Sequence, residues 1–323
     1  MMIKKYIVAW FLGIGIMAMG MSLANAPLQN ETQLMNKVKL GELLFNEKRL
    51  SLDTSISCAS CHLPMFGFAD TLALSKGVGG KVGTRNTPSV TNMSARPLLF
   101  LDGRANSLEH QVHFPINNAV EMDFTIAAAI KRLRKDKAYR QYFKTIYGQL
   151  PDSANLVDAI ATFERSLETS NTPFDRWMVG DSSAMNAAAI RGREVFMSEK
   201  AKCFECHFSP DFTGDEFRNI GLYDGSPTLN DVGRFAITKD SSDLGRFRVP
   251  SLRNVGVTAP YMHNGAFGTL RQVIDYYDNP HQTVKNAINM DTLLQKPLLL
   301  TEQEKTDLEA FLHALTDVRF LKK

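Results

Sequence analysis

The chain has 323 residues, of which 44% are hydrophobic and 22% are charged. These proportions are typical of a globular protein and exclude an intrinsically disordered one. The formal net charge is only +3, which is too small to indicate nucleic acid or an anionic membrane surface as a partner.

The N-terminal segment has the features of an export signal. Two lysines precede an apolar run over residues 6–21, and small residues follow it, which is the pattern of a secretory signal peptide. We expect cleavage after Ala24, because cleavage after Ala26 would leave a proline next to the cut. A signal peptide over residues 1–24 predicts a periplasmic protein. An uncleaved anchor is the alternative, but the run is shorter than the ~20 residues of a membrane span.

The four cysteines form two copies of the pattern C-x-x-C-H, which is the covalent attachment site of c-type haem. In such a site the two thiols bond to the vinyl groups of one porphyrin, and the histidine is an axial ligand of its iron. Two disulfides, or a zinc site made of two cysteine pairs, would leave both histidines unexplained. We therefore predict two c-type haems and no disulfide. The residues are Cys58, Cys61 and His62, and then Cys203, Cys206 and His207.

A short repeat precedes each haem motif. The pattern G-x-x-x-F occurs at residues 41–45 and again at 192–196, and an internal repeat indicates two similar units. We expect a mainly α fold of two cytochrome c-like domains, each with one haem and long haem-packing loops. The domains are predicted over residues 25–170 and 171–323.

Three further stretches have the apolar spacing of helices. Residues 125–147 read as one amphipathic helix, and residues 156–167 as a second. Residues 301–315 form the third, which opens with the capping box Thr-x-x-Glu. No stretch has the sustained alternation of apolar and polar residues that would predict a β-sheet.

Several motifs outside the haem sites are highly specific in combination. They are R-N-T-P at 85–88, L-D-G-R at 101–104, R-V-P-S-L-R-N at 248–254 and T-A-P-Y-M-H-N-G at 258–265. With the haem motifs, they make the chain resemble the bacterial diheme cytochrome c peroxidases and their relative MauG, over nearly the whole mature sequence. The resemblance implies that the N-terminal haem reacts with peroxide and the C-terminal haem relays electrons.

The resemblance also assigns residues to the peroxide site. It places Glu121, Gln111 and Pro115 over the iron held by His62. Cleavage of peroxide requires a group that takes a proton from one oxygen and returns it to the other, and a carboxyl in an apolar pocket has its pKa raised toward that task. Gln111 would orient the peroxide without titrating. Without the resemblance, Glu121 would be interpreted as a solvated surface carboxylate.

A calcium ion between the domains is a further implication of the resemblance. Its ligands would be the side-chain oxygen of Asn86 and the carbonyl oxygens of Thr258 and Pro260, and ligation by oxygen alone suits this cation. His263, in the same C-terminal motif, is expected to contact a cofactor.

Three departures from the family pattern affect the expected chemistry. The first concerns a histidine that caps the peroxide-reacting iron in many of the peroxidases. Val78 occupies the matching position, and the loop over residues 76–83 contains no histidine. His110 and His113 lie near in sequence and are expected to be packing or surface residues. The peroxide site is therefore predicted to be open.

The second departure concerns the second haem, where the peroxidases have a methionine ligand. Tyr277 stands at that position, as in MauG, and the spacing of apolar residues puts it on the inner face of its helix and Tyr276 elsewhere. A plain core tyrosine remains an alternative, and Met262 and Met290 are rival ligands. A phenolate ligand would lower the reduction potential relative to methionine.

The third departure is the absence of two tryptophans. Leu101 stands where the family has a tryptophan between the haems, and Ala201 stands where MauG has one before its second haem motif. Phe100 and Phe204 are the aromatic residues left to line the gap. We expect less efficient electron transfer between the haems.

These observations favour a periplasmic peroxidase that reduces hydrogen peroxide with electrons from a monohaem cytochrome c or a cupredoxin. A MauG-type enzyme that oxidises side chains of a partner protein is the first alternative. It is favoured by Tyr277 and by the missing histidine, but not by the missing tryptophans. A non-catalytic diheme carrier is the second, although a carrier would not need Glu121 and Gln111. A homodimer is a possible assembly of the chain.

Overall fold

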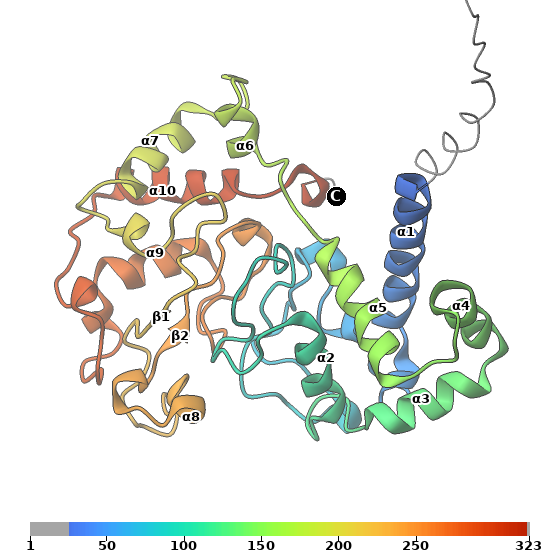
Figure 1. Cartoon of the computed structure of the whole chain (residues 1–323). Helices are drawn as coiled ribbons and strands as arrows, with labels where there is room; N and C mark the ends of the chain where they lie inside the picture. The colour runs from blue at the N-terminus through green and yellow to red at the C-terminus, as the bar shows by residue number, and fades with distance from the viewer. Residues whose placement is uncertain (1–25, 322–323) are drawn as a thin grey trace, which may run out of the picture.

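The computed structural model of the protein describes residues 26–321, so the expected signal peptide lies outside the described residues. These residues form a mainly helical structure (Figure 1), as the sequence predicts. None of their helices combines the length and apolar character needed to cross a membrane. Two short strands, β1 (Phe217–Arg218) and β2 (Phe247–Arg248), pair antiparallel. The helices are α1 (Ala26–Phe45), α2 (Leu108–Asn117), α3 (Ile126–Lys135), α4 (Lys137–Tyr147), α5 (Ser153–Arg165), α6 (Pro173–Met178), α7 (Ala187–Phe196), α8 (Phe235–Thr238), α9 (Leu270–Asp278) and α10 (Glu302–Ala314).

One helix prediction is wrong. The stretch 125–147 is not a single helix, because it breaks at Asp136 into α3 and α4. The Asp136 carboxylate accepts hydrogen bonds from the backbone N–H groups of Ala138 and Tyr139, at 2.7 and 3.0 Å. It thereby caps the start of α4 and favours a new helix over continuation of the old one.

The other two helix predictions are confirmed, with small changes at the ends. Helix α5 begins three residues earlier than the apolar spacing suggested, because Asp152 and Asn155 form its capping box. Helix α10 begins at the predicted capping box, in which the Thr301 and Glu304 side chains bond to each other's backbone N–H groups.

The G-x-x-x-F repeat marks an equivalent helix pair in each half of the chain. Helix α1 packs along α5 in the first half (residues 26–170), and α7 packs along α10 in the second half (residues 171–321). A Cβ atom at Gly41 would lie 2.0 Å from the carbonyl oxygen of Ala159, and one at Gly192 would lie 1.8 Å from that of Asp307. Only glycine allows either pair to approach so closely. Each half also has its own apolar core.

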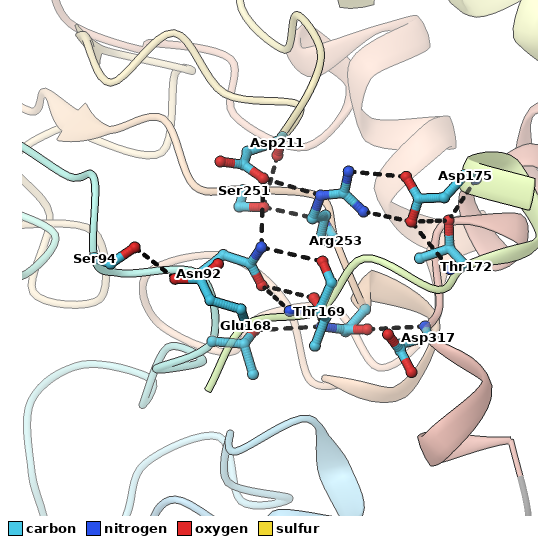
Figure 2. A network of polar contacts seen from close by, with 12 residues as sticks. Asn92, Ser94, Glu168, Thr169, Thr172, Asp175, Asp211, Ser251, Arg253 and Asp317 are labelled. Atoms are coloured by element: carbon cyan, nitrogen blue, oxygen red, sulfur yellow. Dashed lines mark hydrogen bonds and ion pairs between the residues drawn. The ribbon is translucent and has the colours of Figure 1, made fainter. Parts of the chain in front are cut away.

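The chain crosses between the halves through a buried polar network (Figure 2). Thr169 donates to the side-chain oxygen of Asn92 from its backbone N–H at 3.0 Å and from its hydroxyl at 2.6 Å. Asn254, in the second half, donates from its side-chain amide to the hydroxyl of Thr169 at 3.1 Å and to that of Thr91 at 3.3 Å, both in the first half. Because buried polar groups are costly unless they are paired, this network fixes the two halves relative to each other.

The end of the described chain returns to the first half. The last turn, Val318–Phe320, places Phe320 in an apolar cluster with Phe45, Phe68 and Phe163. Asp317, just before it, accepts a hydrogen bond from the backbone N–H of Asn171 at 3.0 Å. The second half therefore contributes to the packing of the first.

Candidate active site

A cavity of about 390 Å³ lies in the first half, at the first C-x-x-C-H motif. Its volume falls within the ~300–1,000 Å³ of typical ligand pockets. Helix α2, the segment that follows it, the haem motif, the end of α5 and the loops over 83–93 and 99–104 line the cavity. The residues that the sequence assigns to the peroxide site lie on its wall: Cys58, Cys61, His62, Gln111, Pro115 and Glu121.

The two motif histidines are held in the same way. Nδ1 of His62 lies 3.0 Å from the carbonyl oxygen of Phe68, and Nδ1 of His207 lies 2.9 Å from that of Phe212. Since a carbonyl only accepts hydrogen bonds, each Nδ1 carries the proton, and Nε2 keeps the lone pair that binds a metal. Burial also lowers the pKa of both imidazoles and favours this neutral form.

The thiols are equally suited to haem attachment. All four cysteines are free, and burial raises the pKa of Cys61 and of Cys206 to about 11, so these thiols stay protonated. Within residues 26–321, no three His, Cys, Asp or Glu side chains gather at one point to hold a metal ion. The two cysteine pairs are therefore not assembled into a zinc site, and each motif fits one c-type haem.

Glu121 is the titratable residue of the segment after α2 that lines the cavity. Its Oε1 accepts a hydrogen bond from the amide of Asn118 at 2.6 Å. Burial raises the pKa of the carboxyl, while the Asn118 bond and the charge of Arg104 oppose the rise. The carboxyl therefore binds a proton more readily than an exposed glutamate does.

Arg104 is a cavity residue whose place the sequence did not reveal. Its guanidinium lies 3.6 Å from the ring centroid of Phe100 and donates to Asp102 at 2.7 Å. The cation–π contact and the ion pair hold the charge in place at the cavity wall. In the sequence, the only indication that Arg104 matters was its position in the L-D-G-R motif.

The loop that carries Val78 is hydrogen-bonded to residues 118–124, which include Glu121 and are named here the peroxide segment. The backbone N–H of Val78 donates to the carbonyl of Glu121 at 2.8 Å, and the Val78 side chain is buried. His110 is exposed, and its Nδ1 lies 3.2 Å from the side-chain oxygen of Asn106. His113 does not line the cavity either, so His62 is the only histidine among the described residues on its wall.

Tyr277 lies within electrostatic range of the two thiols of the second haem motif. Burial raises the pKa of its phenol, and the nearby thiols of Cys206 and Cys203 add to the rise. Tyr276 does not point away from the interior as the helix pattern predicted. It is itself buried, and its hydroxyl donates to the carbonyl of Ile220 at 2.7 Å. Met262 belongs to the same apolar cluster as both tyrosines.

The three oxygens expected to bind calcium accept no hydrogen bond from a described residue. The Asn86 amide nitrogen donates to the carbonyls of Leu72 and Ala73, both at 3.2 Å, which leaves its side-chain oxygen unused. Among the described residues, no N–H or hydroxyl donates to the carbonyl oxygens of Thr258 and Pro260. An oxygen-only set of this kind fits a hard cation such as Ca²⁺.

His263 does not line the cavity at the first haem motif, although its carbonyl accepts a hydrogen bond from the backbone N–H of the lining residue Asn86 at 2.7 Å. Its ring stacks on Phe247 with 4.0 Å between centroids, and its Nδ1 is enclosed without a hydrogen-bond partner among residues 26–321. Burial lowers its pKa to about 4, so the imidazole is neutral. An enclosed Nδ1 without a protein partner is consistent with a group that the protein alone does not supply.

The positions of the missing tryptophans are filled differently in the two halves. Leu101 lines the first cavity, and its carbonyl accepts a hydrogen bond from the backbone N–H of Arg248 at 2.7 Å. Ala201 is buried in the core of the second half. Phe100 also lines the first cavity, whereas Phe204 packs on Phe208 with 6.4 Å between centroids.

Glu164, at the end of α5, is a cavity residue that the sequence analysis missed. It is buried, and burial raises the pKa of its carboxyl to about 8. Its spacing offered a signal, because it follows Ile160 by four residues and so shares the inner face of the helix.

Comparisons with known proteins identify the family. The profile of the family described as di-haem cytochrome c peroxidase matches residues 35–183. The chain is 39% identical to the methylamine utilization protein MauG of Methylorubrum extorquens (strain AM1) over 285 residues, which cover 86% of this chain and 78% of that protein. It is 34% identical to the cytochrome-c peroxidase IdrP1 of Pseudomonas sp. (strain SCT) over 318 residues, which cover 89% and 83% of the two chains.

A solved structure agrees in fold. A MauG-like protein associated with microbial copper homeostasis superposes with a TM-score of 0.81 at 33% identity, over 89% of this chain and 91% of that one. Both the sequence and the fold therefore match over most of the described chain. This chain is a member of the family of di-haem cytochrome c peroxidases and MauG proteins.

Proposed function

We propose that the chain is a periplasmic diheme c-type cytochrome peroxidase, which reduces hydrogen peroxide to water with electrons from a small redox protein. The observation that carries the proposal is the first cavity, where a neutral His62 shares the wall with Glu121 and Gln111. A carboxyl of raised pKa beside an amide is the combination that peroxide cleavage needs.

Cys58, Cys61 and His62 would hold the first haem, and Cys203, Cys206 and His207 the second. The bound haems would supply iron that passes electrons to peroxide. The chain's own residues handle the protons, because reduction of one peroxide to two waters consumes two electrons and two protons. The Glu121 carboxylate would accept the proton of one peroxide oxygen and return it to the departing oxygen, while Gln111 holds the peroxide by hydrogen bonds.

The fastened loop at Val78 supports a site that is open to peroxide in the oxidised protein. A valine cannot bind iron, and the Val78 N–H bond to Glu121 keeps the loop against the peroxide segment. Peroxide could then react without prior reduction of the second haem. Replacement of both His110 and His113 by alanine should leave the spectrum of the oxidised haems unchanged.

The proposal is tested by the stoichiometry of turnover. The diheme protein is mixed with hydrogen peroxide and a reduced monohaem cytochrome c, and in parallel with a reduced cupredoxin. We expect two donor molecules to be oxidised for each peroxide consumed. Consumption of peroxide without donor oxidation would contradict a donor-linked peroxidase.

A MauG-type enzyme that oxidises a partner protein is the second candidate, and Tyr277 is the observation that favours it. The phenol lies beside Cys203 and Cys206, where it would meet the second haem. This candidate predicts that peroxide is consumed without a donor and that side chains of a partner protein are oxidised, which mass spectrometry of the partner detects. A non-catalytic carrier would instead show two low-spin haems and no reaction with peroxide.

Three further assignments belong to the same proposal. Export would remove residues 1–24, which N-terminal sequencing of the periplasmic protein tests. The two domains would meet near residue 170, between α5 and α6. Calcium would bind Asn86, Thr258 and Pro260, and removal with a chelator followed by metal analysis measures its content.

A further inference from the structure

Glu164 is a second carboxyl on the wall of the first cavity, and the peroxide chemistry proposed above does not use it. Only 4% of the residue is exposed, and it lines the cavity together with Cys58 and Cys61. No described residue donates a hydrogen bond to its side chain. Its oxygens are not among the fully enclosed atoms that lack a partner, so they border the cavity itself.

The charged groups around Glu164 leave it without a dedicated partner. Arg165, its neighbour in α5, is already paired with Glu109 of α2 on the outer surface. On the side of the haem motif, the charge of Glu164 acts on the Cys58 thiol, which becomes an uncharged thioether once haem is attached. Glu121 lies on the wall of the same cavity. A carboxylate at this place is poorly solvated, and the charge of Arg165 offsets this cost only in part, so proton binding is favoured.

We propose that Glu164 couples reduction of the first haem to the uptake of one proton. The proposal rests on haem attachment at Cys58, Cys61 and His62, which the proposed function shares, but it does not depend on peroxide turnover. One electron gained from the donor adds negative charge near Glu164. The ionised form of the carboxyl then becomes less stable, and one proton from solvent binds to it. On oxidation of the iron the carboxyl releases that proton, so the charge of the cavity stays constant.

The coupling has a measurable consequence for the reduction potential. Between the pKa of Glu164 in the oxidised protein and its higher pKa in the reduced protein, the potential of the first haem falls as the pH rises. For one proton per electron the limit is about 59 mV for each tenfold fall in proton concentration. We expect the fall near the raised pKa of Glu164, which is about 8 without haem.

The experiment is a potentiometric titration of the complete diheme protein at several pH values on both sides of that pKa. In the wild type, the midpoint potential of the first haem should fall as the pH rises through this range. In Glu164→Gln that shift should be lost, while the midpoint potential of the second haem stays as in the wild type. Glu109→Gln, which removes the partly exposed carboxylate paired with Arg165, is the matched control and should keep the shift.

Two results would overturn the proposal. A wild-type potential that does not change over this range shows that no proton is coupled, and an unchanged shift in Glu164→Gln shows that the proton binds elsewhere, as on a haem propionate. Glu121→Gln separates this proposal from the proposed function, because it should lose the peroxide reaction and keep the shift.

Infrared spectroscopy supplies a measurement that does not depend on the stability of the variant. The redox difference spectrum of the wild type should contain the C=O band of a protonated carboxyl that appears on reduction of the first haem. Absence of that band would refute proton uptake at Glu164, even if Glu164→Gln failed to fold.

Discussion

The close approach of Gly77 to the peroxide segment predicts a large effect from a single methyl group. A Cβ atom at Gly77 would lie 2.2 Å from the carbonyl oxygen of Val120 and 2.4 Å from that of Glu121. The backbone of Gly77 does not need glycine, because its φ is −96°. The cost of Gly77→Ala is therefore the collision alone.

The size of the effect follows from the displacement. The Val78 loop and the Glu121 segment must separate by roughly 1 Å before the new contact approaches the ~3.5 Å of a van der Waals optimum. Overpacking of this kind typically costs ~1–3 kcal/mol of stability, which a folded protein tolerates. A shift of ~1 Å in a reacting group can lower a rate ~100-fold. We expect Gly77→Ala to fold and bind haem, but to react with peroxide about 100-fold more slowly.

Stopped-flow mixing of the oxidised protein with peroxide measures the rate, and the pyridine haemochrome assay measures the haem content. Gly83→Ala is the matched control in the same loop. Its Cβ would meet only the carbonyl oxygen of Ser75, at 3.7 Å, which is an ordinary contact. The control should react at the wild-type rate. Equal peroxide rates in Gly77→Ala and in the wild type would refute the argument that this contact positions Glu121.

Five further predictions concern the haems and the proton. Glu121→Gln should bind haem normally and lose about 100-fold or more in its stopped-flow reaction with peroxide. Because the pKa of Glu121 is raised, the wild-type rate should fall with decreasing pH while the pH is still above the usual carboxyl range, and a flat pH profile would remove Glu121 from the mechanism. The haemochrome assay should give two haems per chain, and one after replacement of Cys203 and Cys206 by alanine. Electron paramagnetic resonance of the oxidised protein should show a high-spin first haem, and two low-spin signals would indicate a capped iron. In the same spectrum, Tyr277→Phe should turn the second haem high-spin only if the phenolate is its ligand.

The parts of this protein that sequence predicts well are those set by local chemistry. Haem attachment requires a fixed spacing of thiols and histidine, so the motif from Cys58 to His62 can be identified without knowledge of the fold. Helix α10 follows from a capping box and from apolar spacing, both of which are local. The break at Asp136 was missed because a capping aspartate inside an amphipathic stretch looks the same as a solvated one until the chain turns.

The remaining features depend on contacts between distant segments. The Gly77 contact joins a loop to a segment more than 40 positions away, and the burial of Glu164 depends on the packing of α5 beside Cys58. Neither spacing nor composition specifies such contacts. The family resemblance supplied Glu121 and Gln111 as candidates, but it carried no information about the groups that hold them.

The return of the last turn to the first half also has a consequence for the order of assembly. On the proposed export route, Cys58 would leave the translocation channel long before Phe320. The apolar cluster around Phe45, beneath the first haem motif, is complete only when Phe320 has arrived. The half that is made first would therefore close last, and its haem motif would remain accessible to haem attachment until Phe320 has emerged.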